Sequence, residues 1–350
     1  MKHNTQPTGR WLLLFLAGFG GLMLFFGSAA VAGAARGLAL CGNTVIPSLF
    51  PFFVLSGTLI GMGAGDALAQ KLAKPLRRWF GIAPQGGMAL VMGLLGGYPL
   101  GARAVCNLYE EKRITQTDAQ RLLCFANNTG PSFFVGAVGL GVFGSVKIGL
   151  LLYLIHALSA LLVGRFFAVL RSQPRSPYSV QPFNASRQRF AAAFSQAVVS
   201  SCSSMLAISG FVVFFSALLS VGKQLLPALD APLLSGLLEM TSGVMALRDL
   251  APLTAFCLAS CIISWGGLCV HCQTLSIVYA AGLEPRGYLT GKLLHALTAT
   301  ALCLPVAAIL FGHPAERWLF WLIPAAFLLL MLIFAKFAKK RTSISCQNCV

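Results

Sequence analysis

Charged residues are scarce in this chain, and acidic residues most of all. Only 10% of its 350 residues are charged, and 9 are Asp or Glu against 26 Lys or Arg. A soluble domain carries about 25% charged residues, whereas 57% of this chain is hydrophobic and its mean hydropathy is +0.79. The composition therefore excludes a soluble globular protein and predicts a membrane protein that has the lipid bilayer as its partner.

Sequence motifs of common enzymes and metal sites are also missing. The chain has no GxSxG, HExxH or Walker phosphate-binding loop, and no pair of intramembrane carboxylates at catalytic spacing. Most of its 11 cysteines lie in apolar segments, where cysteine acts as a small hydrophobe. The pair Cys346 and Cys349 has no second Cys or His pair nearby. We therefore expect no enzyme activity, no catalytic residues, no metal site and no cofactor.

The formal charge of +17 does not predict nucleic-acid binding. Lys and Arg occur in short clusters between apolar runs, as at 71–78, 112–113 and 336–341. This distribution is typical of the positively charged loops of membrane proteins. We expect no nucleic-acid partner.

Several apolar runs are long enough to cross about 30 Å of hydrocarbon. They span residues 11–34, 40–63, 122–143, 146–170, 198–222, 288–312 and 316–335. Three further apolar stretches, 86–108, 232–247 and 252–280, are interrupted by Gly, Pro or polar residues, which favours interfacial helices or re-entrant hairpins. The first run is longer than the apolar part of a signal peptide and is interpreted as a retained helix. The predicted fold class is an all-α polytopic membrane protein.

Two glycine pairs occupy matching places in the two halves. Setting Gly96-Gly97 on Gly266-Gly267, a shift of 170 residues (266 − 96), also aligns the polar turns and helices that follow. Broken helices free backbone donors and acceptors for a solute, so repeated breaks indicate a transporter's binding site. We predict two inverted repeats with Gly-broken re-entrant hairpins. The expected divisions are a tail and extra helix (1–36), a first repeat (37–171), a basic Ser/Pro-rich linker (172–197), a second repeat (198–338) and a polar tail (339–350).

Five motifs carry a family resemblance: Ile46–Phe53, Gly96–Ala102, Phe125–Pro131, Leu238–Gly243 and Gly266–Gln273. They are distributed over most of the range 37–312 and resemble the YlbJ group of sporulation integral membrane proteins, also called SpoVV, in the nucleoside-recognition Gate-domain superfamily. The resemblance implies a duplicated Gate fold, akin to the core of concentrative nucleoside and ferrous-iron transporters. It also implies a multi-pass protein of the bacterial cell membrane or forespore membrane that moves the anion dipicolinate. The motifs specify the family better than the substrate, because the Gate fold serves unrelated solutes.

Arg103 lies within one helical turn of the first glycine-bearing hairpin. A charge at membrane depth should face a cavity or a partner, and a guanidinium presents parallel donors to a carboxylate. The alternative is that Arg103 reaches the headgroups. Asn127, Asn128 and Thr129 form an amide-rich break, which is either a binding site or a contact between helices.

Glu239, Lys292 and His295 are candidates for proton coupling or for charge pairing. In the second case Glu239 would pair with Lys292 or with Arg103. The lone His156 is interpreted as a structural residue. The predicted substrate-binding residues are Gly96, Gly97, Tyr98, Arg103, Asn127, Asn128, Thr129, Gly266, Gly267, His271 and Gln273.

The leading hypothesis is a transporter of a small anionic metabolite, with a substrate site between two hairpins. A nucleoside-type carrier is the alternative if the amides outweigh Arg103 in binding. A structural or assembly protein of the spore envelope would instead have a sealed, dry core at the hairpins. The sequence leaves the oligomeric state open. The hypotheses differ most clearly in whether polar cavities adjoin the glycine pairs.

Overall fold

The computed structural model describes residues 8–170, 188–312, 322 and 325–326, and this part of the chain contains helices without strands. Five helical stretches within it are long and apolar enough to cross a membrane: Gly27–Gly61, Val146–Leu170, Phe190–Leu225, Pro252–Ala280 and Tyr288–Leu310. The predicted all-α polytopic class is confirmed. The tail at 339–350 lies outside the described residues, as does nearly all of the run expected at 316–335.

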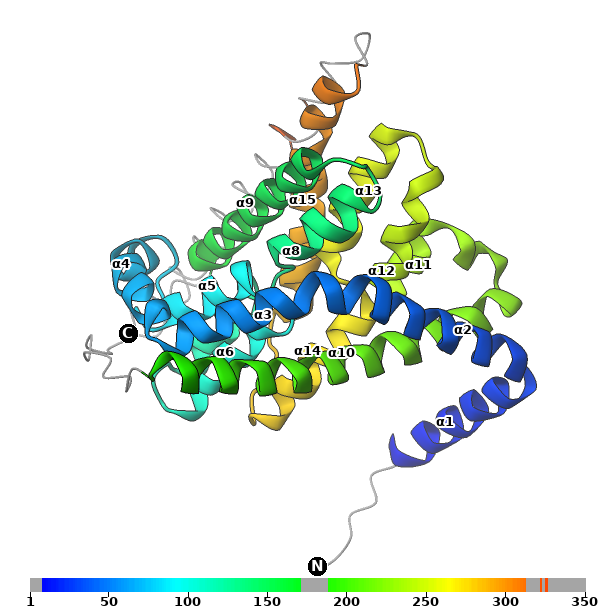
Figure 1. Ribbon diagram of the computed structural model, residues 1–350, viewed down its shortest axis with the longest axis horizontal. Helices are drawn as coiled ribbons and strands as arrows, with labels where there is room; N and C mark the ends of the chain where they lie inside the picture. Colours follow the sequence, from blue (N-terminus) through cyan, green and yellow to red (C-terminus); the bar gives the residue numbers. More distant parts are fainter. Residues whose placement is uncertain (1–7, 171–187, 313–321, 323–324, 327–350) are drawn as a thin grey trace, which may run out of the picture.

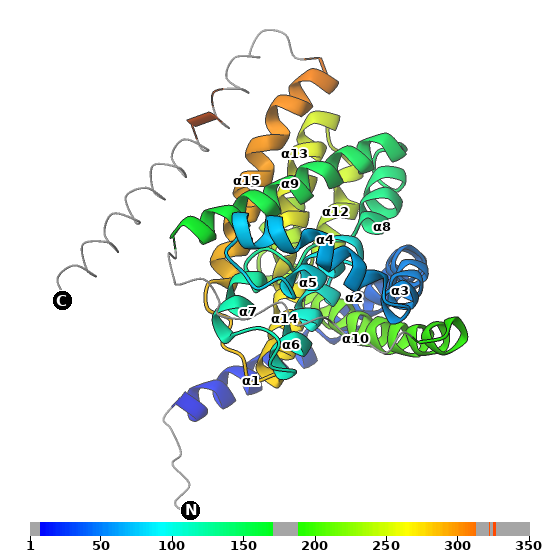
Figure 2. The same cartoon turned by 90° about the vertical axis from the view of Figure 1, so that its left-hand side faces the viewer.

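The first half begins with α1 and a long helical rod. The elements are α1 (Thr8–Phe25), α2 (Gly27–Leu40), the π-helical segment η1 (Cys41–Val45) and α3 (Ile46–Gly61). This rod of α2, η1 and α3 lies along α10 (Phe190–Leu225), and α1 extends away from the pair (Figures 1 and 2). A Cβ on Gly37 would lie 2.9 Å from Val213 Cα. Small residues thus let the two rods approach closely, which is how helices commonly associate in lipid.

A helical hairpin and a broken helix follow the rod. The elements are the amphipathic α4 (Ala64–Trp79), α5 (Gly86–Leu95), α6 (Leu100–Glu110), α7 (Gln116–Leu123), α8 (Pro131–Phe133), the π-helical η2 (Phe134–Leu140) and the unbroken α9 (Val146–Leu170). The chain reverses between α5 and α6 at Gly97, whose φ of +84° is readily available to glycine. Residues 124–130 between α7 and α8 are not helical. The span predicted at 122–143 is therefore interrupted.

The second half repeats this order of elements. After α10 come the 3₁₀ turn η3 (Pro227–Asp230), α11 (Pro232–Leu238), α12 (Met240–Met245), the 3₁₀ turn η4 (Ala246–Asp249), α13 (Pro252–Trp265), α14 (Gly267–Ala280) and the unbroken α15 (Tyr288–Leu310). Helices α11 and α12 pack as a hairpin that reverses at Glu239. Gly266, with φ of +94°, breaks the stretch that α13 and α14 form. Helices α13 and α15 run side by side, with α9 against α15 (Figure 2).

The order of elements corrects the predicted pairing of the two glycine pairs. The first pair lies at a hairpin tip, and its counterpart by position is the α11–α12 tip at Glu239. The second pair breaks a spanning stretch, and its counterpart is the break at 124–130. The shift of 170 was therefore wrong. The expected division of the chain, the inverted orientation and the re-entrant hairpins stay predictions.

Each hairpin has a glycine pair where its two arms cross. A Cβ on Gly93 of α5 would lie 3.3 Å from Gly101 Cα, and a Cβ on Gly243 of α12 would lie 2.2 Å from Gly236 Cα. Side chains at these four positions would push the arms apart. Close crossing therefore depends on glycine in both hairpins, and it fixes where the two tips lie.

We predict that Gly93→Ala strongly destabilises the protein. The new methyl group would lie 1.5 Å from Ala126 O, so the backbone of the broken helix or of α5 must shift. Overpacking of this kind costs about 1–3 kcal/mol or more. The measurement is the thermal unfolding midpoint of the purified protein in detergent. Gly210→Ala is the matched control because nothing lies within 4 Å of its Cβ, and equal midpoints for the two variants would contradict the packing.

Candidate functional site

The four interruptions of the helices meet at one place, which we call the junction. A Cβ on Gly97 would lie 2.7 Å from Gly130 N, so the first hairpin tip touches the first broken helix. A Cβ on Gly266 would lie 3.1 Å from the Tyr98 hydroxyl, and one on Gly267 would lie 2.9 Å from Met240 N. Segments from both halves of the chain therefore form a single contact region around residues 97–98, 127–130, 239–240 and 266–267.

Helix ends at the junction are held by specific partners. Glu239 precedes α12 and accepts hydrogen bonds from the backbone N–H groups of Thr241 at 2.9 Å and Ser242 at 2.6 Å. Pro131 begins α8, a position where proline's missing N–H costs nothing. The Asn127 side chain accepts from Ala102 N at 3.2 Å and donates to Thr274 Oγ1 at 2.9 Å, which ties the first break to α6 and α14.

A buried cation lies beside these helix ends. Lys292 of α15 is 1% exposed, and its Nζ donates to the Tyr98 hydroxyl, to Asn127 O at 3.3 Å and to His295 Nδ1 at 3.3 Å. Three acceptors match the three N–H donors of an ammonium group. All three acceptors are neutral, and among the described residues no carboxylate lies within ion-pair distance of Lys292. Its hydrogen bonds are satisfied while its charge has no counter-ion.

Two neighbouring histidines connect this lysine to the first break. His295 Nε2 donates to His156 O at 2.9 Å, since a carbonyl can only accept, so its Nδ1 is free to accept from Lys292. His156 Nε2 accepts from Thr129 N at 3.2 Å, and its Nδ1 then donates to Ser264 Oγ at 2.9 Å. The partners thus fix the tautomer of both rings, and the two rings lie in contact with centroids 4.4 Å apart and planes tilted by 42°.

A small cavity of about 40 Å³ opens between the junction and the two long rods. Its polar lining comes from both hairpin tips, the first break and α14: Tyr98, Thr129, Glu239, Thr241 and Gln273. Its apolar lining includes Val45, Leu49, Ile208 and Val212. Gln273 is 4% exposed, and its amide nitrogen has no hydrogen-bond partner. The cavity therefore presents a carboxylate, hydroxyl groups and an unused N–H donor.

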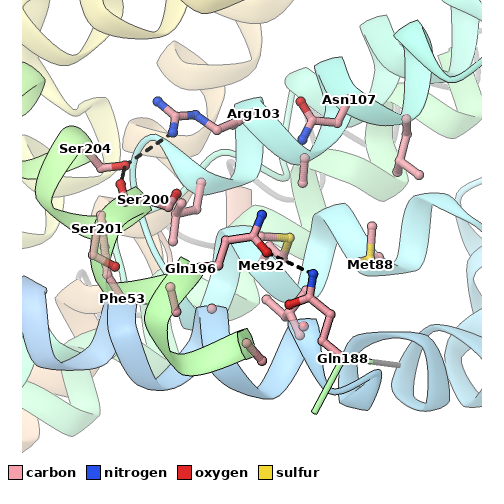
Figure 3. Close-up of a pocket in the computed structure, with 18 of the residues that line it drawn as sticks. Phe53, Met88, Met92, Arg103, Asn107, Gln188, Gln196, Ser200, Ser201 and Ser204 are labelled. Carbon is pink, nitrogen blue, oxygen red and sulfur yellow. Dashed lines mark hydrogen bonds between the residues drawn. The ribbon is translucent and has the colours of Figure 1, made fainter. Parts of the chain in front are cut away.

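The structure brings most of the predicted residues together but separates Arg103. Tyr98, Asn127, Thr129, Glu239, Gly266, Gly267, Gln273, Lys292 and His295 line or contact the junction. Gly96 lies against Gly130, and Asn128, fully buried, donates to Phe125 O at 2.7 Å. His271 contacts the Tyr288 hydroxyl at 3.0 Å. Arg103 instead points into a larger cleft of about 590 Å³ between α3, α6 and α10 (Figure 3).

The predicted ion pairs of Glu239 are not formed. Among the described residues the salt bridges join Arg113 to Glu111, Lys223 to Asp230 and Arg286 to Glu284. Glu239 is 1% exposed and is held by backbone N–H groups rather than by Lys292 or Arg103. Its carboxylate is therefore left to cap α12 and to line the small cavity.

Sequence reasoning missed two residues of the network, Ser264 and Tyr288. His156, interpreted as structural, is fully hydrogen-bonded and connects α9, α13, α15 and the first break. A lone polar residue in each of several apolar helices was the available signal. The partners could not be found without knowing which helices pack together.

The chain is similar in sequence to a sporulation membrane protein. It is 29% identical to the sporulation integral membrane protein YlbJ of Bacillus subtilis (strain 168) over 314 residues, which are 79% of this chain and 77% of the relative. No protein-family model matches the chain, and no solved structure gives a significant match. The similarity supports the YlbJ family, and together with five helices long enough to span a bilayer it identifies a multi-pass membrane protein.

We predict that Tyr98→Phe destabilises the junction. The change removes the hydroxyl that accepts from Lys292 and leaves one donor of a buried ammonium unpaired, at a cost of about 1–3 kcal/mol. Thermal unfolding in detergent measures the loss. Tyr279→Phe is the control. Because Tyr279 is 62% exposed, this variant should unfold at the wild-type temperature. If Tyr98→Phe also unfolds at the wild-type temperature, Lys292 does not depend on this acceptor.

Proposed function

We propose that the chain carries a small anionic metabolite across a bacterial membrane and binds it at the junction. The observation that supports this most directly is Lys292, buried among neutral acceptors where the four interruptions meet. A buried charge without a counter-ion costs several kcal/mol. An anionic solute would offset that cost only while it is bound. The burial of Lys292 without a counter-ion therefore raises the free energy of the empty site and favours the binding of an anion.

Tyr98 connects the cation to the space where a solute would bind. Its hydroxyl accepts from Lys292, and its side chain lines the small cavity. The unused amide N–H of Gln273 lies on the same cavity. Both features favour a solute that brings acceptor oxygens. At about 40 Å³ the cavity is too small for a metabolite, so the hairpin tips must separate to admit one.

The two alternative functions receive less support. A nucleoside-type carrier would use the amides of the first break, but both ends of the Asn127 side chain are already occupied by Ala102 N and Thr274 Oγ1. The Asn128 amide N–H donates to Phe125 O, which leaves only its Oδ1 without a partner. A structural protein of the spore envelope would have a sealed core at the hairpins. Two cavities with polar linings adjoin the hairpins instead. A carrier for an anion fits these contacts better than either alternative, and it requires no enzyme chemistry.

Dipicolinate is the substrate that we propose. The relative YlbJ is a sporulation integral membrane protein. The family resemblance of the sequence motifs implies dipicolinate movement during spore formation. A planar dicarboxylate also suits the chemistry of the site, because one carboxylate can face the cation while the other accepts from amide or backbone N–H groups. In this proposal the two halves form inverted Gate-type repeats. Glu239, held away from Lys292, is then a candidate to bind a coupling proton or cation.

We predict that Lys292→Met abolishes dipicolinate transport. Methionine keeps much of the side-chain volume but removes the positive charge that would hold the anion. The assay is uptake of radiolabelled dipicolinate into proteoliposomes at matched protein content. Lys223→Met is the control, since Lys223 is partly exposed at the end of α10 and pairs with Asp230 at 2.9 Å. Its uptake should equal that of the wild type.

Two results would contradict the proposal. Equal uptake with and without wild-type protein would reject dipicolinate transport altogether. Full uptake by the Lys292→Met protein would reject the junction as the anion site. A general unfolding effect of the substitution is recognised by comparing the thermal midpoints of Lys292→Met and wild type before the assay.

A further inference from the structure

The cleft that contains Arg103 is large enough for a small solute. It encloses about 590 Å³ and lies between α3, the α5–α6 hairpin and α10 (Figure 3). Small-molecule sites in proteins generally measure about 300–1,000 Å³. Its polar side chains are Arg103, Asn107, Glu111, Arg113, Gln188, Gln196, Ser200, Ser201 and Ser204. The cleft therefore combines sufficient volume with several polar groups that converge on it.

Arg103 provides an uncompensated positive charge in this cleft. One of its guanidinium nitrogens donates to Ser204 Oγ at 3.3 Å, and Ser204 in turn donates to Ser200 O at 2.9 Å, which orients the serine oxygen towards the arginine. A guanidinium has five N–H donors. Glu111 at the edge of the cleft pairs with Arg113 at 3.3 Å, and no described carboxylate pairs with Arg103. The remaining donors can bind an anion.

The rest of the cleft lining is apolar and includes flexible sulfur side chains. Phe53, Ile60, Met88, Met92 and Leu100 form this part of the wall. Methionine sulfur contacts aromatic rings favourably, and Phe53 offers an aromatic edge or face. A guanidinium beside such a wall suits a solute that combines a carboxylate with a flat ring.

An apolar layer separates the cleft from the junction. Phe53 and Leu100 line the cleft, while Leu49 and Ile208 line the small cavity, and all four belong to one packed hydrophobic cluster between the rods and α14. Phe53 is 2% exposed. A hydrated anion cannot pass such a layer while it remains packed, since burying an unpaired charge there is costly.

We infer that the cleft is a second anion-binding site, in series with the junction, for a small aromatic carboxylate. This inference rests on the proposed transport function and adds an entry step to it. Arg103 holds the carboxylate in a hydrated cleft, and the ring rests on Phe53 and the methionines. Displacement of Phe53 and Leu100 then opens the path to Tyr98 and Lys292.

The experiment measures binding of radiolabelled dipicolinate to the purified protein in detergent by equilibrium dialysis. Lys292→Met removes the cation of the junction, so the binding that remains reports the cleft. Arg103→Gln in that background should weaken the remaining binding by about 10- to 100-fold, the value of a charge-assisted hydrogen bond. Arg103→Lys should fall between, because it keeps the charge but loses the planar pair of donors.

Matched controls test the position of the charge and the contribution of the ring. Arg165→Gln removes an exposed arginine that donates to Trp79 O at 2.8 Å, away from the cleft, and should leave binding unchanged. Glutarate, an aliphatic dicarboxylate, should compete more weakly than dipicolinate for the Lys292→Met protein. Equal competition would overturn the aromatic part of the inference.

The outcomes separate this inference from the proposed function. If the wild type transports dipicolinate while Lys292→Met binds none, or binds it equally with and without Arg103, the second site is overturned and the carrier stands. If the wild type neither binds nor transports dipicolinate, the carrier proposal fails first.

Should Lys292→Met not fold, uptake kinetics decide the question. Arg103→Gln should raise KM with little change in kcat, and an unchanged KM would overturn the entry site.

Discussion

Backbone hydrogen bonding inside the bilayer is the constraint on which this structure depends. Hydrocarbon offers no partners, so every break in a membrane helix leaves N–H and C=O groups that must be satisfied within the protein or face water. Four such breaks among the described residues meet at the junction, and each contacts another there. Met240 N lies against Gly267, Gly130 N lies against Gly97, and side chains of Glu239 and His156 accept from freed N–H groups. The breaks are tolerated because they are assembled together.

Contact between backbone segments explains why glycine is concentrated here. Two backbone segments of the chain can approach within about 3 Å of each other only where at least one of them has a glycine, which carries no side chain. The crossings at Gly93 with Gly101 and at Gly236 with Gly243 bring the hairpin arms together, and Gly97 and Gly267 bring the tips onto the broken helices. Lys292 then reaches the carbonyl of Asn127, a group that an intact helix would have used internally. The geometry of the breaks therefore creates the cation's environment.

The sequence predicted the class, the spans at 146–170, 198–222 and 288–312 and most residues of the junction, because apolar run length and glycine breaks act locally. It did not predict how the breaks correspond. A hairpin tip and a break in a spanning helix have the same sequence pattern, an apolar run that contains glycine. For that reason Gly96-Gly97 was matched with Gly266-Gly267 instead of with Glu239. The glycines at 93 and 101, and those at 236 and 243, were the sequence signal for the two hairpins that cross at these positions. Likewise, the separation of Arg103 from Lys292 depends on which rod packs against α6, and no local pattern records that contact.

The different surroundings of the two cations favour a stepwise path for an anion. Arg103 is partly exposed in a wide cleft and has one neutral side-chain partner, whereas Lys292 is fully buried with three. An anion that moved directly from water to Lys292 would lose its hydration in one step, at a cost that rises as the dielectric constant falls. In the proposed path, pairing first with Arg103 would replace part of that hydration while the cleft is still wet. The apolar layer of Phe53 and Leu100 would then divide a single large desolvation cost into two smaller ones, because it separates the cleft from the junction.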